Sequence, residues 1–281
     1  MRSPRLADLA KAAKPKPLRM SKMRADPGIR IAFIPDLQHF PGAPVDHLRW
    51  IGAWIKDRKP AVVVQAGDFV EMGSCSSYDA PGSLEAEGRS IAADLACCRA
   101  ALAVLGNAMG GHRCRKIVTL GNHENRLARY VNDHPEHRDT YAHDPFGFEA
   151  AGWETQPFLE PIEVAGITFV HFTPRSASGR VTQTRNGAPN ALTMVKREMR
   201  SCVAGHAQGL DTACLTVGGK MLRGIIAGSA YPWEEEYMGA QGRDYWRGVI
   251  ELNEAADGYA DVCEVSLSFL CRRYGGGRWP K

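Results

Sequence analysis

The feature that most constrains the fold is a short polar turn, Gly121-Asn122-His123, between a strand-like run and a helix-like run. The strand-like run, Lys116–Thr119, is rich in β-branched residues, and Asn125–Val131 has the spacing of a helix. Open α/β sheets place their ligands at such a turn, where a parallel strand passes into a helix. Asn122 offers a neutral oxygen there, and His123 offers an imidazole that can transfer a proton near neutral pH.

Other strand-like runs also end in acids, amides or histidines, at Asp36, Gln38, Asp68, His171, His206 and Gln208. A single strand-end acid is usually a turn or cap residue. Several in one chain predict a polar cluster, because the carboxyl ends of parallel strands meet at one edge of a sheet. We therefore expect these side chains and Asn122 to share one site.

The chain has 281 residues, which is long enough for one large domain. Its first half alternates strand-like and helix-like runs and predicts a parallel sheet, whereas short turns in the second half predict mostly antiparallel pairing. We predict a layered αββα sandwich, with two mixed sheets flanked by helices, in a single domain over residues 28–271. Within it we expect a helix from Ser83 to about Leu105 and a last strand from Tyr259 to Leu270.

The net charge of +4 conceals two basic ends. Residues 1–26 carry a charge of +6 and the last ten residues +4, which leaves −6 for the middle of the chain. We predict a basic, flexible leader over residues 1–27 and a basic tail over 272–281. Such segments are either solvated or in contact with a polyanion such as nucleic acid.

The eight cysteines have no C-x-x-C spacing, and the N-terminus lacks the apolar core of a secretory signal. No run approaches the roughly 20 apolar residues that a membrane span needs. These features predict a cytoplasmic protein with free thiols and no membrane partner. The oligomeric state has no signature in the sequence.

The strand-end set combines carboxylates, an amide oxygen and imidazoles, which suits borderline divalent metals such as Mn²⁺, Fe²⁺, Ni²⁺ or Zn²⁺. Two such ions roughly 3.5–4 Å apart, with a bridging carboxylate, would activate a water and neutralise a phosphoryl group. His123 lies next to a candidate ligand and is the candidate general acid. Glu71, three residues after Asp68, is the candidate partner that holds the ring of His123.

The ordered motifs resemble the calcineurin-like metallophosphoesterase superfamily over roughly residues 29–271. They are Asp36-x-Gln38, Gly67-Asp68-x-x-Glu71, Gly121-Asn122-His123-Glu124, His171 and Gly205-His206-x-Gln208. The resemblance implies two divalent ions bridged by Asp68. One ion would take Asp36, Asp68, Gln38 and Gln208. The other would take Asp68, Asn122, His171 and His206. The resemblance also makes His123 the acid and a phosphate contact, with Glu71 as its partner, and adds Asn122 to the phosphate site.

Two departures from the family fall on the same metal site. The family usually has His where this chain has Gln38 and Gln208. The site therefore becomes rich in oxygen donors, which favours Mn²⁺ or Mg²⁺ over Zn²⁺. The departures also leave open a protein that holds one ion well and the other only with substrate bound. His39 could take the place of Gln38 as a ligand only if the strand end shifts, because neighbouring side chains on a strand face opposite ways. We therefore expect His39 to be a pocket or surface residue.

A third departure from the family pattern narrows the class of substrate. Met72 stands where the Ser/Thr protein phosphatases of the superfamily have a phosphate-gripping Arg, which disfavours a phosphoprotein phosphatase. Arg126, a turn past His123, either contacts the phosphate instead or lies on a solvated helix face.

We predict a Mn²⁺-dependent phosphoesterase of the bacterial or phage type that prefers phosphodiesters, with nucleic acids or nucleotides as candidate substrates. A hydroxide activated by two metal ions would attack the phosphate, and His123 would protonate the leaving group. The alternative is a catalytically weakened nucleic-acid-binding or scaffolding protein on the same fold. Its basis is the pair Gln38 and Gln208 together with the basic ends.

Overall fold

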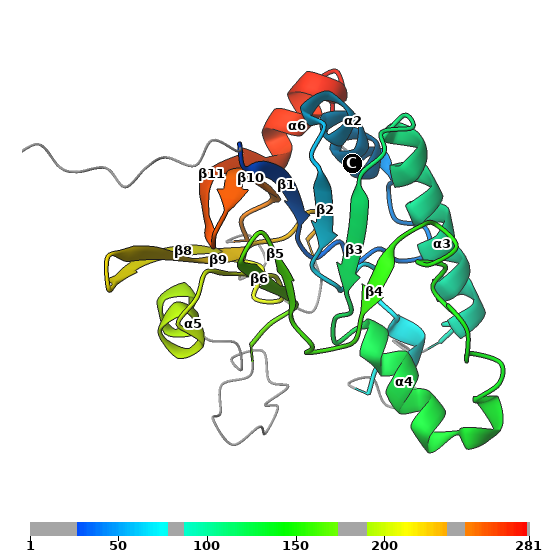
Figure 1. Cartoon of the computed structure of the whole chain (residues 1–281). Helices are drawn as coiled ribbons and strands as arrows, with labels where there is room; N and C mark the ends of the chain where they lie inside the picture. The colour runs from blue at the N-terminus through cyan, green and yellow to red at the C-terminus, as the bar shows by residue number, and fades with distance from the viewer. Residues whose placement is uncertain (1–26, 78–86, 174–189, 235–244, 280–281) are drawn as a thin grey trace, which may run out of the picture.

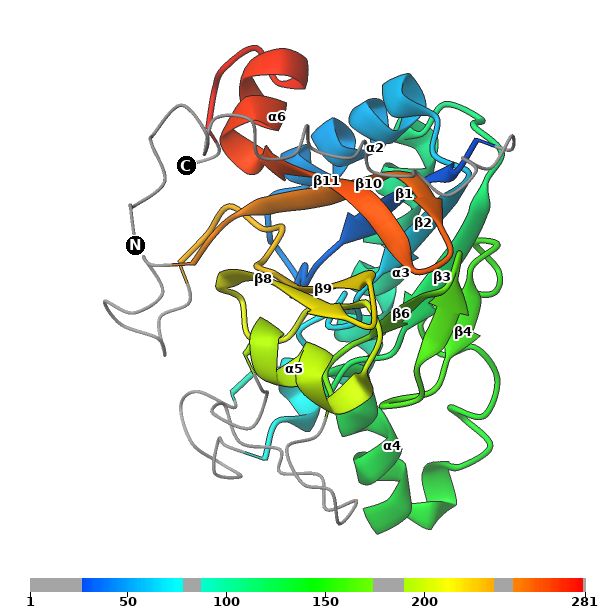
Figure 2. The ribbon, with the colours of Figure 1, turned by 60° about the vertical axis from the view of Figure 1, so that its left-hand side comes forward.

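The computed structural model describes residues 27–77, 87–173, 190–234 and 245–279, and the structural statements below concern these residues. Two sheets pack face to face, and helices cover the outer face of each sheet (Figures 1 and 2). The predicted αββα sandwich of two mixed sheets is therefore confirmed. The leader predicted over residues 1–27 lies, apart from Pro27, outside the described residues.

The larger sheet has the strand order β11-β10-β1-β2-β3-β4. Its strands are β1 (Ile29–Ile34), β2 (Val62–Gln65), β3 (Arg115–Thr119), β4 (Glu154–Gln156), β10 (Gly248–Ala256) and β11 (Tyr259–Ser266). Strands β1 to β4 are parallel, and β10 pairs antiparallel with both β1 and β11. Every residue of β2 is buried, as expected for a parallel strand that is covered on both faces.

The smaller sheet has the strand order β5-β6-β7-β9-β8. Its strands are β5 (Ile162–Val164), β6 (Ile167–Val170), β7 (Cys202–Ala204), β8 (Leu210–Val217) and β9 (Lys220–Ala227). Strands β6, β7 and β9 are parallel, so the expectation of mostly antiparallel pairing is wrong at the centre of this sheet. The connection from β6 to β7 contains helix α5 (Ala191–Glu198), and a connection of that length permits a parallel return.

Helices α2 (Asp46–Arg58), α3 (Ile91–Ala108) and α6 (Leu267–Tyr274) pack together on the larger sheet, and α5 packs on the smaller one (Figure 2). Helix α4 (Glu124–Asp133) follows the carboxyl end of β3, and the short 3₁₀ turns are η1 (Gly73–Cys75) and η3 (Pro135–His137). Among the described helices, α3 alone is long and apolar enough to resemble a membrane span by length and composition. It nevertheless buries Leu95, Cys98 and Leu102 in the core against the sheet.

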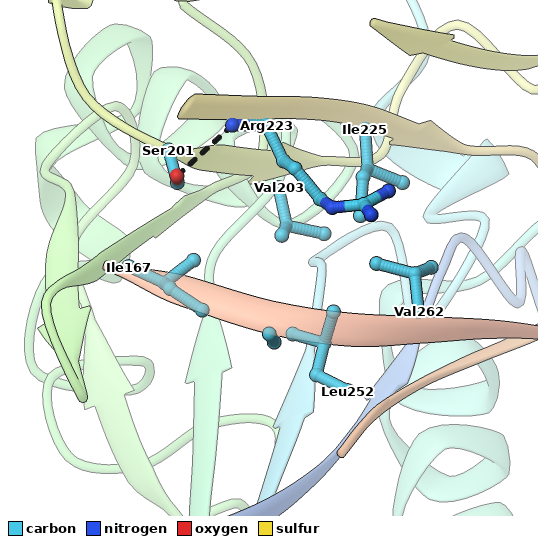
Figure 3. Close-up of a pocket in the computed structure, with 8 residues that line it drawn as sticks. Ile167, Ser201, Val203, Arg223, Ile225, Leu252 and Val262 are labelled. Atoms are coloured by element: carbon cyan, nitrogen blue, oxygen red, sulfur yellow. Dashed lines mark hydrogen bonds between the residues drawn. The ribbon is translucent and has the colours of Figure 1, made fainter. Parts of the chain in front are cut away.

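The two sheets are held together by an apolar layer in which the Phe33 and Phe169 ring centroids lie 5.8 Å apart. A small pocket opens at one edge of this layer, where Arg223 extends among aliphatic side chains of both sheets (Figure 3). The Arg223 guanidinium donates to the Tyr259 hydroxyl at 3.3 Å and lies 5.3 Å from its ring centroid. The long side chain therefore fills the edge of the core, while its charged end pairs with an aromatic residue.

Two predicted boundaries are corrected. Helix α3 begins at Ile91, where the Ser90 side chain accepts from a backbone N–H as the N-cap, and Ser83 lies outside the described residues. Strand β11 ends at Ser266, whose hydroxyl oxygen accepts from Phe269 N at 3.2 Å and begins helix α6. A short apolar run such as 267–270 does not distinguish a strand from a buried helix, which explains the second error. Helix α6 also includes the first three residues of the predicted C-terminal tail.

Helix α2 carries a histidine in an apolar setting. His47 is fully buried, and both ring nitrogens lack a hydrogen-bond partner among the described residues. Its ring centroid lies 6.0 Å from that of His39 and 5.3 Å from that of Trp233. Burial, with a smaller contribution from His39, lowers the pKa of His47 to about 3, and burial lowers the pKa of His39 to about 4.

These depressed pKa values predict acid sensitivity. As the pH falls below about 6.5, the unfolded chain takes up protons that folded His39 and His47 do not, so the free energy of unfolding falls. We expect a loss on the order of a few kcal/mol by pH 4, and a shallower loss in His47→Leu. Urea unfolding at stepped pH measures both slopes, with exposed His143→Leu as the matched control. Identical slopes in His47→Leu and the parent would contradict the assignment.

Candidate active site

The carboxyl ends of β1, β2 and β3 meet at one edge of the larger sheet. Leu37 N and Gln38 N both donate to the Asp68 carbonyl oxygen, at 3.0 and 2.7 Å, so the loops after β1 and β2 run side by side. The loop after β7 joins them from the smaller sheet, because His206 N donates to Asp36 Oδ1 at 2.8 Å. The polar residues predicted at the strand ends therefore come together from both sheets.

Two glycines allow this close approach. A Cβ atom at Gly121 would overlap Asp68 Oδ1, and a Cβ at Gly205 would overlap Asp36 Oδ1. Each glycine directly precedes a predicted ligand, Asn122 or His206. The missing side chains therefore let the backbones of these loops lie against the two carboxylates.

The centre of the site is formed by Asp68, His171 and His206, whose potential ligand atoms all lie within 4.8 Å of one another. His171 Nε2 lies 2.9 Å from Asn122 Oδ1 and 3.4 Å from Asp68 Oδ2. His171 Nδ1 lies 2.7 Å from the Ala66 carbonyl oxygen, to which it donates. This second-nitrogen hydrogen bond directs Nε2 at the oxygen ligands, as is typical of histidines that bind metals.

Charge compensation sets the protonation of this centre. Burial alone would lower the pKa of His171, but Asp68 and Asp36 outweigh it and raise the pKa to about 9. Burial alone would raise the pKa of Asp68, but His123 and His171 outweigh it and lower the pKa. The proton on His171 Nε2 lies where a metal–ligand bond would form, and metal binding would displace it.

Three buried atoms of predicted ligands show whether metal ions fit the site. Asp36 Oδ2, Gln38 Oε1 and His206 Nδ1 have no hydrogen-bond partner among the described residues. Each would cost about 1–3 kcal/mol if left unsatisfied. Burial and the neighbouring Asp68 raise the pKa of Asp36 to about 7, whereas burial and His171 lower the pKa of His206 to about 3 and leave it a neutral imidazole. Carboxylate, amide and imidazole lone pairs of this kind are ligands for divalent metals, so the residues fit.

His123 lies beside this centre, at the junction of β3 and α4. Its Nδ1 lies 3.1 Å from Glu71 Oε2, and its Nε2 lies 3.7 Å from Asp68 Oδ2. Burial alone would lower the pKa of His123, but Asp68 and Glu71 outweigh both burial and Arg126 and raise it to about 9. Glu71 therefore orients the ring and, together with Asp68, keeps it protonated at neutral pH.

A family model described as calcineurin-like phosphoesterase matches residues 29–186, more than half of the chain. The chain belongs to the calcineurin-like phosphoesterase family. The predicted resemblance is thereby confirmed, and membership implies metal-dependent hydrolysis of phosphoesters with divalent ions, typically two.

The solved structures that are similar to the chain include two that cover most of it. One is a dimetal phosphatase from Danio rerio, with 9% sequence identity and a TM-score of 0.42 over 86% of this chain and 100% of the other. The second has 10% identity and a TM-score of 0.42 over 84% of this chain and 99% of the other. No curated protein is significantly similar in sequence. The family match ends before His206 and Gln208, so the inclusion of His206 rests on the geometry, whereas Gln208 stays a prediction.

Arg126 of this phosphoesterase is held inside the site. Its Nη1 donates to the Glu71 carbonyl oxygen at 2.7 Å and to Glu71 Oε1 at 3.1 Å, and its Nη2 lies 3.1 Å from His123 Nε2. Burial alone would raise the pKa of Glu71, but His123 and Arg126 outweigh it and lower the pKa. The hydrogen bonds of the Arg126 guanidinium therefore orient Glu71, whereas its contact with His123 Nε2 is a hydrogen bond only when that nitrogen carries no proton. This buried position differs from the solvated helix face considered as one alternative.

No role is predicted for Glu124 from the sequence, yet its carboxylate holds the loops after β2 and β3 together. Its Oε2 accepts from Gly121 N and Asp68 N, both at 2.8 Å, and its Oε1 accepts from Phe69 N at 2.8 Å. Glu124 is buried, so the loops after β2 and β3 are joined through one side chain. Its position just after His123 shows only an acid in the first turn of a helix, and its actual donors, Asp68 N, Phe69 N and Gly121 N, lie in the loops before that helix.

The two glutamines behave differently from each other. Gln38 is buried beside Asp68 with its Oε1 unpaired among the described residues, whereas Gln208 Oε1 accepts from the Tyr231 hydroxyl at 2.6 Å. His39 is buried and packs against His47 and Trp233, so the surface position that was one of its two predicted places is wrong. His39 is also not among the three residues of the central group.

Replacing the Glu124 carboxylate will destabilise the protein. In Glu124→Gln an amide NH₂ would face backbone N–H donors, so we expect a loss of roughly 2–4 kcal/mol in the free energy of unfolding. Urea unfolding at neutral pH measures the loss, and exposed Glu160→Gln serves as the control with the same chemical change. A variant as stable as the control would show that the loops do not depend on this carboxylate.

Proposed function

We propose that this phosphoesterase hydrolyses phosphodiesters, with Mn²⁺ as its preferred metal and His123 as the general acid. One observation carries the proposal. The His123 imidazole is held by Glu71 at 3.1 Å beside the group formed by Asp68, His171 and His206. An acid with a fixed orientation next to a metal-ligand group is the arrangement that phosphoester hydrolysis needs.

The ligands divide between two ions. Asp68, Asn122, His171 and His206 would hold one, and Asp36 and Gln38 offer oxygen donors, together with Asp68, to the other. When bound, divalent ions lower the pKa of a water and neutralise the phosphoryl oxygens. The preference for Mn²⁺ follows from a donor set that mixes imidazoles with hard oxygen ligands.

His123 performs the proton transfer in this proposal. Its Nδ1 lies 3.1 Å from Glu71 Oε2, and Nε2 is the nitrogen that would give its proton to the leaving alkoxide or aryl oxide. The raised pKa of about 9 keeps the acid form present at neutral pH. Arg126 fixes the Glu71 carboxylate from the other side. Asn122 remains a candidate phosphate contact as well as a ligand.

The charge of the site supports a diester substrate. A phosphate monoester carries about 1.5 to 2 negative charges at pH 7, whereas a diester carries only one. Met72, at the position of the phosphate-gripping Arg of the Ser/Thr protein phosphatases, is buried in the core, and the Arg126 guanidinium contacts Glu71 and His123. Neither Met72 nor Arg126 therefore adds a free guanidinium to the charge of the metal ions, which favours the monoanion, and Met72 disfavours a phosphoprotein phosphatase.

We also propose a cytoplasmic location, which the eight free cysteines support because reducing compartments keep thiols unpaired. Contact with nucleic acid through the basic leader stays a prediction, since residues 1–26 lie outside the described residues.

A substrate comparison tests the proposed function. We expect purified protein to hydrolyse bis(p-nitrophenyl) phosphate at least about tenfold faster than p-nitrophenyl phosphate in kcat/KM, which is about 1.4 kcal/mol of transition-state preference. Mn²⁺, Mg²⁺, Fe²⁺, Ni²⁺ and Zn²⁺ are added singly, and Mn²⁺ should support the highest rate. Folded protein that turns over neither substrate with any metal would overturn the proposal, and faster monoester hydrolysis would overturn the diester preference.

The role of His123 is tested with two leaving groups. In His123→Asn we expect kcat for a dinucleotide, whose alkoxide leaving group needs a proton, to fall by about 10²–10⁴-fold. The loss for bis(p-nitrophenyl) phosphate should be much smaller, because nitrophenolate leaves without protonation. His143→Asn, an exposed histidine, is the control. Equal losses on both substrates would show that His123 does not act as the acid.

A further inference from the structure

The two halves of the proposed metal centre have unequal donors. On one side lie two imidazoles, His171 and His206, with the Asp68 carboxylate, and their ligand atoms are within 4.8 Å of one another. Asn122 Oδ1 lies 2.9 Å from His171 Nε2 and completes this nitrogen-containing set. The His171 ring is fixed through its other nitrogen by the Ala66 carbonyl. This half is therefore arranged for a metal before any ion binds.

The other half offers only oxygen. Asp36 Oδ2 and Gln38 Oε1 are buried without hydrogen-bond partners among the described residues. An amide oxygen is neutral and is a weaker ligand than an imidazole for borderline metals, whereas hard cations accept it. Asp68 is the one ligand that the two halves share in the proposed function. Among the described residues, this half therefore has no nitrogen donor that would retain a borderline ion.

The side chain of Gln208 has a hydrogen-bond partner that competes with a metal ion. The Tyr231 hydroxyl donates to Gln208 Oε1 at 2.6 Å and so occupies one of the two lone pairs of that oxygen. Tyr231 is fully buried, and its ring stacks on Trp233 with centroids 5.0 Å apart. The Arg247 guanidinium lies 5.4 Å from the Tyr231 ring centroid. The tyrosine is therefore a fixed donor, and Gln208 has a standing partner other than a metal.

We propose that the protein holds one divalent ion tightly, on Asp68, Asn122, His171 and His206, and a second only weakly, on Asp36, Gln38 and Asp68. Tyr231 keeps Gln208 outside the second donor set. The weak position selects a hard, oxygen-preferring cation such as Mg²⁺ or Mn²⁺. This inference rests on the proposed function for the identity of the ligands and specifies how the two ions differ.

Metal titration tests the inference directly. Full-length protein is freed of metal with a chelator, and Mn²⁺ is added while free Mn²⁺ is counted by electron paramagnetic resonance and heat is recorded by calorimetry. We expect one equivalent to bind with a dissociation constant at least about 100-fold below that of the second. Two equivalents of equal affinity would overturn the proposal.

Matched variants identify the residues. The double variant Gln38→His with Gln208→His should raise the Mn²⁺ affinity of the second site by at least about tenfold and leave that of the first unchanged. Gln156→His on β4 is the control. Tyr231→Phe should tighten the second site several-fold, because it frees Gln208 Oε1. His206→Ala should abolish the tight site. Circular dichroism establishes that each variant folds, and an unchanged second site in both the double variant and Tyr231→Phe would overturn the assignment.

The readout is independent of turnover, so the two proposals fail in different ways. One tight and one weak equivalent without phosphodiester hydrolysis would overturn the proposed function and support the metal asymmetry. Hydrolysis with two equally tight equivalents would overturn the asymmetry and support the function. A parent protein that binds no Mn²⁺ at all would overturn both.

Discussion

Two buried carboxylates, Asp36 and Asp68, interact electrostatically at the edge of the larger sheet, and the arrangement of the site follows from their charge. Burial and mutual repulsion oppose ionisation of both, so the pKa of Asp36 rises while Asp68 stays ionised beside His123 and His171. Without metal ions, protonated imidazoles compensate the charge of these carboxylates, and divalent cations would compensate it more strongly. The same charge keeps His123 protonated. The proposed metal affinity and the proposed acid catalysis would thus be two consequences of one electrostatic arrangement.

The fold supplies the scaffold that holds these charges together. Parallel strands β1 to β3 direct their carboxyl ends to one edge, and the loops that follow are joined by the Glu124 carboxylate. Gly121 and Gly205 allow backbone to contact the carboxylates where a Cβ would not fit. The geometry of the candidate site therefore depends on backbone packing as much as on the side chains proposed to perform the chemistry.

The sequence predicted the layered sandwich and the strand-end residues because both depend on local periodicity and on where strands end. Contacts between distant loops were not readable in this way. The attachment of Arg126 to Glu71 spans 55 positions, and the pairing of Tyr231 with Gln208 depends on how two loops of different elements meet. Strand β4 was missed because its three residues are too short to show a period. The start of helix α3 was misplaced because several serines precede it and each is a chemically adequate cap.

The proposed ligands of the tight ion come from both layers of the sandwich. Asp68 and Asn122 follow strands of the larger sheet, and His171 and His206 follow strands of the smaller one. A cation bound there would cross-link the two layers at their common rim, in addition to the apolar contacts between them. Sliding of one layer over the other would then require breaking coordination bonds, so the same ion that serves catalysis would also resist mechanical shear of the whole domain.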